Sequence, residues 1–245
     1  SKGTLGGVFY INRIPTSISR TTFENTTATG NGGVINIEYG THKINFSSFI
    51  GNTSTAQSIV YLFRGVLNLS NSIFYNNSNS NSIIHSGSST AKGTLTAVNN
   101  TFYKNKFTDV ANADADIGAG VITFRNTSFG EANIYNNIFR DNTDNANNLY
   151  DISRIQPSSG TILNLKFNLF ETAYTLTEAK VAVSNNKIYS ASLPVFGANT
   201  TNPAGADFLN IVEGQATEAG DNTLATNAGV LPGTDLAGNP RKTHT

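Results

Sequence analysis

The chain repeats itself about every 26 residues, and this repeat constrains the fold more than any other feature of the sequence. A short apolar segment at residues 7–12 recurs at 33–38 and at 59–64, and weaker copies begin at residues 83, 121 and 149. A column of phenylalanines runs in phase with these segments: Phe23, Phe49, Phe74, Phe102, Phe139 and Phe170. Short repeats of this kind indicate stacked units that share one continuous core.

Each repeat contains three short segments in which apolar and polar residues alternate, separated by turns rich in Asn, Gly and Ser. This pattern predicts three strands per coil of a parallel β-helix. We therefore expect an all-β fold: a right-handed parallel β-helix (solenoid) of about six coils with an irregular C-terminal capping segment, the hand following from the rule for parallel crossovers. A propeller blade needs a longer repeat, and the Leu-x-x-Leu-x-Leu motif of leucine-rich repeats is absent.

Asparagine is the dominant polar residue, with 34 copies against 16 Lys plus Arg. Asn tolerates the left-handed backbone conformation of a sharp corner, and stacked amides bond to one another at the strand spacing of about 4.8 Å. Two columns are predicted to form asparagine ladders: Asn52, Asn77, Asn105 and Asn142, and Asn71, Asn99 and Asn136.

The repeat decays after about Thr172, which divides the chain into coils at 1–172 and a tail at 173–245. We expect the tail to hold the remnants of coils and a turn-rich segment that caps the open end of the same domain, where strand edges would otherwise pair with neighbours.

Charge and composition exclude several partners. The 16 Lys plus Arg balance 16 Asp plus Glu, so the chain has no basic excess with which to bind nucleic acid. No run of 18 apolar residues predicts a membrane span. Without cysteine, the chain has no disulfide, thiolate nucleophile or cysteine-ligated metal.

Four motifs of the tail, in order, suggest a family. They are Leu193-Pro194-Val195-Phe196, Asp207-Phe208-Leu209, Ala219-Gly220-Asp221-Asn222 and Asp235-Leu236-Ala237-Gly238-Asn239-Pro240-Arg241. Together with the Asn-Ser-x-Phe coils, they resemble the bacterial choice-of-anchor Q surface proteins, which are right-handed parallel β-helices similar in shape to pectate lyases. The resemblance covers nearly the whole chain, although the usual ending of such tails is replaced by residues 242–245. It implies a secreted or cell-surface bacterial protein of adhesin-like character, and it carries over no catalytic residue.

Strand alternation predicts one candidate ligand-binding face. If Phe9, Ile35, Tyr61, Ile122, Tyr150 and their i+2 neighbours point inward, the residues between them form an outward row. That row is Tyr10, Asn36, Leu62, His85, Thr123 and Asp151. The predicted ligand-binding residues are Tyr10, Asn36, Glu38, Arg64, His85, Arg125 and Asp151. In pectate-lyase-like folds the equivalent sheet forms the sugar groove, and the alternative is an ordinary solvated sheet.

Catalytic signatures are absent from the sequence, so no catalytic residue, cofactor or metal site is predicted. There is no Asp-Asp pair, and His42, His85 and His244 lack the spacing of metal ligands. Two acidic stretches, at 114–116 and 141–145, offer oxygen ligands for Ca²⁺ but match no EF-hand loop.

One repeat is longer than the others, because it contains insertions at 108–116 and 127–132. Insertions in solenoids collect on one face, so these two mark either a binding face or neutral drift in exposed loops.

The sequence thus favours a non-catalytic extracellular β-helix that binds a polysaccharide or a glycan of a host or cell surface. The second hypothesis is an enzyme, a polysaccharide lyase or glycoside hydrolase of the pectate-lyase-like superfold. The third hypothesis is a purely structural stalk.

Overall fold

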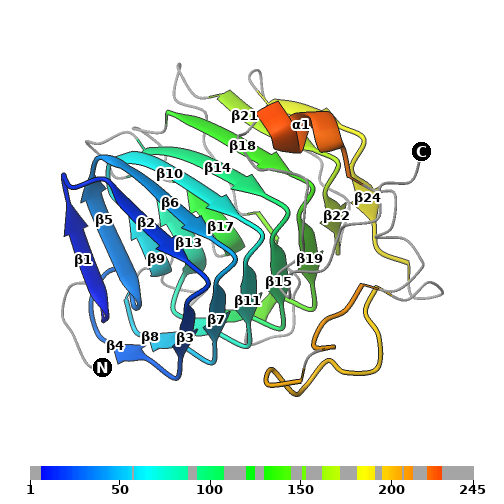
Figure 1. The fold of residues 1–245 in the computed structure, drawn as a ribbon, viewed down its shortest axis with the longest axis horizontal. Coiled ribbons are helices and arrows are strands. Elements are labelled where there is room, and N and C mark those ends of the chain that lie inside the picture. Colours follow the sequence, from blue (N-terminus) through cyan, green and yellow to red (C-terminus); the bar gives the residue numbers. More distant parts are fainter. Residues whose placement is uncertain are drawn as a thin grey trace.

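The chain folds into a parallel β-helix in which successive coils stack in the order of the sequence (Figure 1). The structure, a computed structural model, describes residues 7–56, 58–87, 93–107, 120–124, 130–144, 151–152, 162–171, 181–190, 195–205, 207–211 and 220–227. Every strand pairing in it is parallel, apart from one isolated antiparallel bridge between Phe196 and Ile211. The predicted parallel β-helix solenoid is confirmed.

Four parallel sheets form the walls of the solenoid, and the two longest contain seven strands each. Sheet A contains β1 (Phe9–Asn12), β5 (Ile35–Tyr39), β9 (Ser58–Leu62), β13 (Ser82–Ser86) and β17 (Gly120–Phe124). Sheet B contains β2 (Thr16–Ser19), β6 (Thr41–Asn45), β10 (Gly65–Ser70), β14 (Gly93–Val98), β18 (Glu131–Tyr135), β21 (Ile162–Lys166) and β23 (Val181–Ser184). Sheet C contains β3 (Thr22–Glu24), β7 (Ser48–Ile50), β11 (Ile73–Tyr75), β15 (Thr101–Tyr103), β19 (Ile138–Arg140), β22 (Leu169–Phe170) and β24 (Lys187–Ile188).

Sheet D was not predicted. It contains two-residue strands: β4 (Thr27–Ala28), β8 (Thr53–Ser54), β12 (Ser78–Asn79), β16 (Lys106–Phe107) and β20 (Thr143–Asp144). A coil with all four sheets therefore has four strands rather than the three expected. Two residues are too few to show the alternation of apolar and polar residues by which the other strands are recognised.

The phenylalanine column fills the interior as predicted. The rings of Phe49, Phe74 and Phe102 are fully buried, and their centroids are 4.4 and 5.0 Å apart along the column. The column extends to Phe23 at one end and to Phe170 at the other, with all neighbouring rings stacked. Ile, Leu and Val side chains from sheets A and B complete one continuous core.

The first predicted asparagine ladder is present and fully buried. Asn77 Oδ1 accepts hydrogen bonds from the backbone N–H and from Nδ2 of Asn52, at 3.0 and 2.9 Å. The same pair of bonds joins Asn77 to Asn105 (3.1 and 3.0 Å) and Asn105 to Asn142 (3.1 and 2.9 Å). Each amide therefore satisfies backbone and side-chain groups of the adjacent coil.

The second ladder was predicted one residue too early. Asn71, Asn99 and Asn136 have positive φ, at 49°, 59° and 57°, and form the corner between sheets B and C. Asn99 Nδ2 does reach Asn71 Oδ1, at 3.4 Å, but the buried ladder runs through the next position along the chain. Its members are Asn100, Asn137, Asn168 and Asn186, joined by bonds of 2.8 to 3.0 Å.

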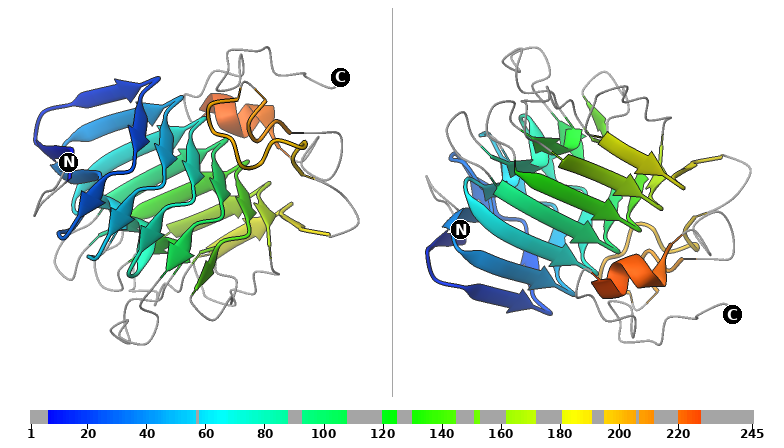
Figure 2. Two further views of the ribbon diagram at one scale, coloured as in Figure 1. Left: turned by 90° about the horizontal axis from the view of Figure 1, so that it is seen from below. Right: turned by 90° about the horizontal axis from the view of Figure 1, so that it is seen from above.

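The described parts of the tail at 195–205, 207–211 and 220–227 pack along the side of the solenoid, and the expected cap on its open end stays a prediction. Phe208 and Phe196 pack edge-on against Tyr75 and Tyr103 on the outer side of sheet C, with ring centroids 4.9 and 5.1 Å apart. The short helix α1 (Asn222–Asn227) lies across the ends of the sheet B strands (Figure 2). Coil remnants do follow residue 172, because β23 and β24 extend sheets B and C.

Candidate functional site

The predicted binding row on sheet A is off by one residue at β9, whereas His85 and Thr123 lie in the row as predicted. Asn36 pairs with Tyr61, and Leu62 pairs with Ile37 inside the core. The prediction of an outward Leu62 and an inward Tyr61 is therefore wrong. Its cause is a spacing of 25 residues between these coils where 26 was assumed, and a slip of one residue turns every side chain of a strand to the opposite face.

Most of this row is buried, so the predicted exposed face is also wrong for several residues. The observed row is Tyr10, Asn36, Tyr61, His85 and Thr123. Only Tyr10 is well exposed, at 47%, whereas Asn36 and His85 are 3% and 0% exposed. The His85 ring stacks on Tyr61 at 5.2 Å, and its Nδ1 lies 2.9 Å from Thr123 Oγ1. Within the chain, His85 and Asn36 thus lie beneath the surface.

Asp151 does not join His85. Its neighbour Ile152 pairs with Ile122, which shifts this coil by two residues from the predicted register and places Asp151 two positions before the row. Its carboxylate is 5% exposed, and Oδ2 accepts a hydrogen bond of 2.8 Å from the backbone N–H of Glu171. The predicted exposure of Asp151 is therefore wrong. Arg125, and the insertions at 108–116 and 127–129, lie outside the described residues.

Three predicted residues do reach the surface, where sheet A bends into sheet B. Glu38 accepts a hydrogen bond from Tyr10. This bond raises the pKa of the Tyr10 phenol above its ordinary value, and desolvation and the negative charge of Glu38 add smaller contributions in the same direction.

Arg64 lies against two aromatic rings at this bend. Its Nη1 donates a hydrogen bond of 2.7 Å to Tyr39 Oη. The Arg64 guanidinium also lies 5.2 Å from the centre of the Tyr39 ring and 5.0 Å from that of Phe63. Arg13 stacks on the same Tyr39 ring at 5.3 Å. We call Arg13, Tyr39, Phe63 and Arg64 the arginine–tyrosine cluster.

The outer side of sheet B offers a more regular surface. One row of outward side chains runs in register across six coils and is partly or fully exposed throughout. We call it the polar face: Ser17, Lys43, Asn68, Thr96, Asn133 and Asn164. Its members are spaced by about 4.8 Å, the distance between adjacent strands.

Neighbouring side chains hold the centre of the polar face in place. Asn133 Oδ1 accepts hydrogen bonds from Tyr135 Oη at 2.7 Å and from Asn164 Nδ2 at 2.8 Å. Asn133 Nδ2 donates to Glu131 Oε1 at 3.1 Å. Burial, and then the Glu131 charge, raise the pKa of Tyr135 above its ordinary value, so its hydroxyl remains a donor at neutral pH.

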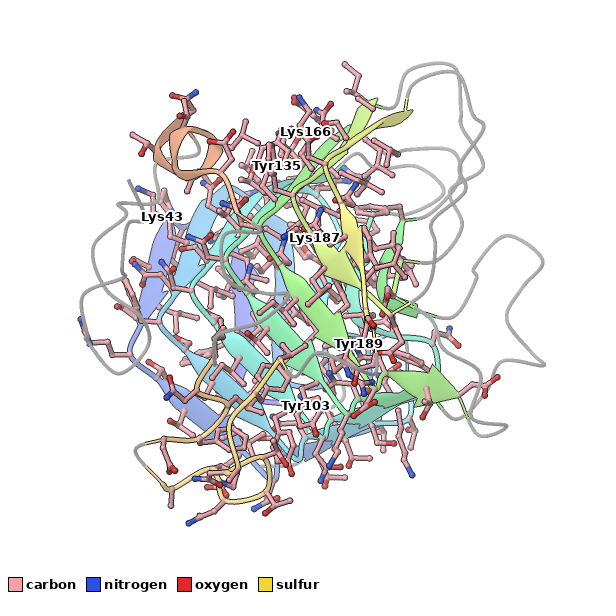
Figure 3. All side chains as sticks on the ribbon, turned by 90° about the vertical axis from the view of Figure 1, so that its right-hand side faces the viewer. Lys43, Tyr103, Tyr135, Lys166, Lys187 and Tyr189 are labelled. Atoms are coloured by element: carbon pink, nitrogen blue, oxygen red, sulfur yellow. The ribbon has the colours of Figure 1, made fainter. Side chains whose placement is uncertain are left out.

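Helix α1 turns part of the polar face into a groove of about 330 Å³. The groove is lined by Asn68, Thr96, Asn133, Tyr135, Leu224 and Asn227. The start of α1 is fixed to the solenoid, because Asp221 N donates to Asn136 Oδ1 at 2.8 Å and Asn136 Nδ2 donates to Asp221 O at 2.9 Å. Ala225 is buried beside Val98. Figure 3 shows Tyr135 and Lys166 on the side of the molecule that carries α1, away from Tyr103.

Sequence reasoning missed this groove for two reasons. The alternation in segments 66–69, 94–97 and 162–165 identified the sheet B strands, but their outward residues were not compared between coils. Helix α1 was read as a turn. Its signal was Asp221, whose Oδ1 accepts hydrogen bonds from the backbone N–H groups of Thr223 and Leu224 as a helix N-cap.

A second and larger groove, of about 480 Å³, lies at the first coil. Apolar side chains contribute to it, among them Phe9 and Ile14, which are 42% and 72% exposed. Its lining comes mainly from β1 and β2, the first strands of sheets A and B, so this groove adjoins two strand edges. Its apolar lining and position distinguish it from the polar, helix-bounded groove on sheet B.

Metal-binding groups do not assemble in the described part of the chain. No three His, Asp or Glu side chains gather there in a way that could hold a metal ion. Of the two stretches considered for Ca²⁺, 114–116 lies outside the described residues. In the other, Asp141 contacts Arg140, and Asn142 belongs to the buried ladder.

No protein-family model, curated protein or solved structure matches this chain. The resemblance to choice-of-anchor Q proteins therefore stays a prediction. Within the described residues, no helix has the length and apolar character that crossing a membrane requires.

Proposed function

We propose that this protein is a non-catalytic, extracellular or cell-surface bacterial protein that binds a glycan chain along the polar face of sheet B. The supporting observation is a row of amide and hydroxyl side chains in register across successive coils, part of it enclosed by α1. A polysaccharide is the matching ligand, because it repeats along its length and presents hydroxyls to donors and acceptors spaced at regular intervals.

The chemistry of the groove fits sugar hydroxyls. Asn68 and Thr96 supply donors and acceptors without a net charge, and neither has a side-chain hydrogen bond to another described residue. Tyr135 adds an aromatic ring with a polar tip, a combination common at binding surfaces. The hydrogen bonds of Asn133 to Tyr135 and Asn164 pre-organise the centre of the face, which lowers the entropic cost of binding.

Binding without cleavage is favoured by the distribution of acids. Among the described side chains on the outer side of sheet B, Glu131 is the only carboxylate. Most glycoside hydrolases place two carboxyl groups about 5–10 Å apart across the scissile bond. The extracellular location rests on the family resemblance alone.

A glycan-array screen followed by titration calorimetry tests this proposal. Asn133→Ala should weaken binding of the selected polysaccharide by about 2–10-fold, as expected for the loss of one or two neutral hydrogen bonds. Asn210→Ala, an exposed asparagine of the tail, is the matched control and should bind like the wild type. Binding to no glycan, or equal binding by both variants, would reject the proposed site. Release of reducing sugar by purified protein would favour the lyase or hydrolase alternative.

A further inference from the structure

Two guanidinium groups share a single tyrosine ring at the bend between sheets A and B. Arg13 and Arg64 lie 5.3 and 5.2 Å from the centre of the Tyr39 ring, and Arg64 also donates a hydrogen bond to its hydroxyl. The bend is tight, because a Cβ on Gly65 would lie 2.4 Å from the carbonyl oxygen of Gly40, and both glycines have positive φ, at 92° and 101°. The backbone thus forces the side chains of Tyr39 and Arg64 together.

These two positive charges have no acidic partner in the described part of the chain. The described ion pairs all belong to Arg140, which binds Glu171 Oε1 at 2.6 Å and also contacts Asp141. Glu38 is the carboxylate next to Tyr39 in sequence, and it is hydrogen-bonded to Tyr10. Two neighbouring cations without a counter-ion repel each other and attract an anion.

Arg64 is also held in a fixed position. Its Nε is buried and has no hydrogen-bond partner among the described residues, while Nη1 is bound to Tyr39. Arg13 is exposed, so its guanidinium is accessible from solvent. A planar guanidinium fork presents two parallel N–H donors to an oxyanion, and stacking on a ring orients the fork in advance.

The cluster adjoins the polar face. Tyr39 and Arg64 directly precede Gly40 and Gly65, the glycines of the bend into β6 and β10, and these two strands contribute Lys43 and Asn68 to that face. In Figure 1, β5 and β9 lie toward the N-terminal end of the solenoid. The cluster therefore lies at the beginning of β6 and β10, four residues before Lys43 and Asn68 along the chain.

We propose that the arginine–tyrosine cluster binds an oxyanion of an acidic glycan, either the carboxylate of a uronic acid or a sulfate ester. This inference rests on the proposed glycan binding and names its substrate class. Amides and hydroxyls of the polar face contact the sugar hydroxyls, while Arg13 and Arg64 select for negative charge.

The test compares a polyuronate, a sulfated polysaccharide and a neutral glucan of similar length at physiological ionic strength. The wild type should bind at least one acidic polymer about tenfold more tightly than the glucan, and the acidic polymer that binds identifies the oxyanion. The double variant Arg13→Gln/Arg64→Gln should lose this preference while its affinity for the glucan stays unchanged. Arg20→Gln is the matched control, because Arg20 also stacks on a ring, that of Phe46 at 5.1 Å, but without a second arginine.

A second measurement separates failure of this inference from failure of the proposed function. Because Arg64 Nε is buried, its N–H should be visible in ¹⁵N–¹H spectra, and galacturonate or inorganic sulfate should shift it in the wild type and in Arg20→Gln. A shift without binding of any polymer would reject glycan binding and retain the anion site. No shift, or an acidic preference that survives in the double variant, would overturn the anion site.

Discussion

The interior and the outer faces of this solenoid follow different rules. Inside, the phenylalanine column repeats one residue type at the same position of successive coils, as in the stacked Phe49, Phe74 and Phe102, and the buried asparagine ladders do the same. In the outward row of sheet A, by contrast, the residue type changes from each coil to the next: Tyr10, Asn36, Tyr61, His85 and Thr123. Identical neighbours are needed where rings must stack and amides must bond between coils. Outward positions vary more, as in Arg13, Tyr39, Phe63 and Arg64 of the arginine–tyrosine cluster, although Asn133 and Asn164 of the polar face still bond between coils.

Two arginines on the outer faces extend this comparison. Arg140 stacks on Tyr189 at 3.6 Å and is also paired with Glu171. Burial opposes its charge, but the hydrogen bond from its guanidinium to Glu171 and the nearby Asp141 outweigh this and raise the pKa of Arg140 above its ordinary value. Arg64 stacks on Tyr39 in a similar way but has no carboxylate partner among the residues that the structure describes. The first arrangement is neutralised within the protein, and the second is the one for which we propose an anionic ligand.

The largest expected effect is on the interior column. Phe102→Ala removes a fully buried ring that stacks on Phe74 and Phe139, and it should lower the free energy of unfolding by about 3–5 kcal/mol. Thr101→Ala, the adjacent partly exposed residue of β15, should change it by less than about 0.5 kcal/mol. Chemical denaturation measures both. A loss below about 1 kcal/mol for Phe102→Ala would show that the column is not a stabilising core.

A smaller effect is expected in the ladder. Asn105→Ala removes the acceptor of the Asn77 N–H and Nδ2 groups and the donor to Asn142 and Phe74, so the unfolding free energy should fall by about 1–3 kcal/mol. Asn68→Ala, on the polar face, should stay within about 0.5 kcal/mol of the wild type. Equal losses for these two asparagines would remove the distinction between interior and outer amides.

The smallest stability difference should separate the two arginines. Arg140→Gln leaves the carboxylate of Glu171, only 8% exposed, without its cation, and should cost about 1–2 kcal/mol. Arg64→Gln loses only stacking and one hydrogen bond to Tyr39, at a cost of about 0.5–1 kcal/mol. Urea denaturation of both variants at neutral pH is the measurement. A larger loss for Arg64→Gln would indicate that its cluster is a structural element rather than a binding site.

The candidate site was less predictable than the fold, and particular residues show why. Tyr10, Glu38 and Arg64 were placed at the surface, as the structure has them. His85 and Asp151 were placed beside them, yet His85 lies beneath the surface and Asp151 accepts a hydrogen bond from the backbone of Glu171, directly after β22 of sheet C. Burial of an outward side chain depends on what covers it, and alternation along one strand contains no information about that.

The sequence by itself determined the coil: its repeat of about 26 residues, the inward phenylalanines and the buried column from Asn52 to Asn142. These features recur locally, because each coil must satisfy the same neighbours above and below. Tertiary structure alone decided the register at Tyr61, the position of α1 over the polar face and the sharing of Tyr39 by two arginines. The physical reason is that a shift of one residue between coils leaves the composition of the repeat unchanged but reverses which side chains face the ligand.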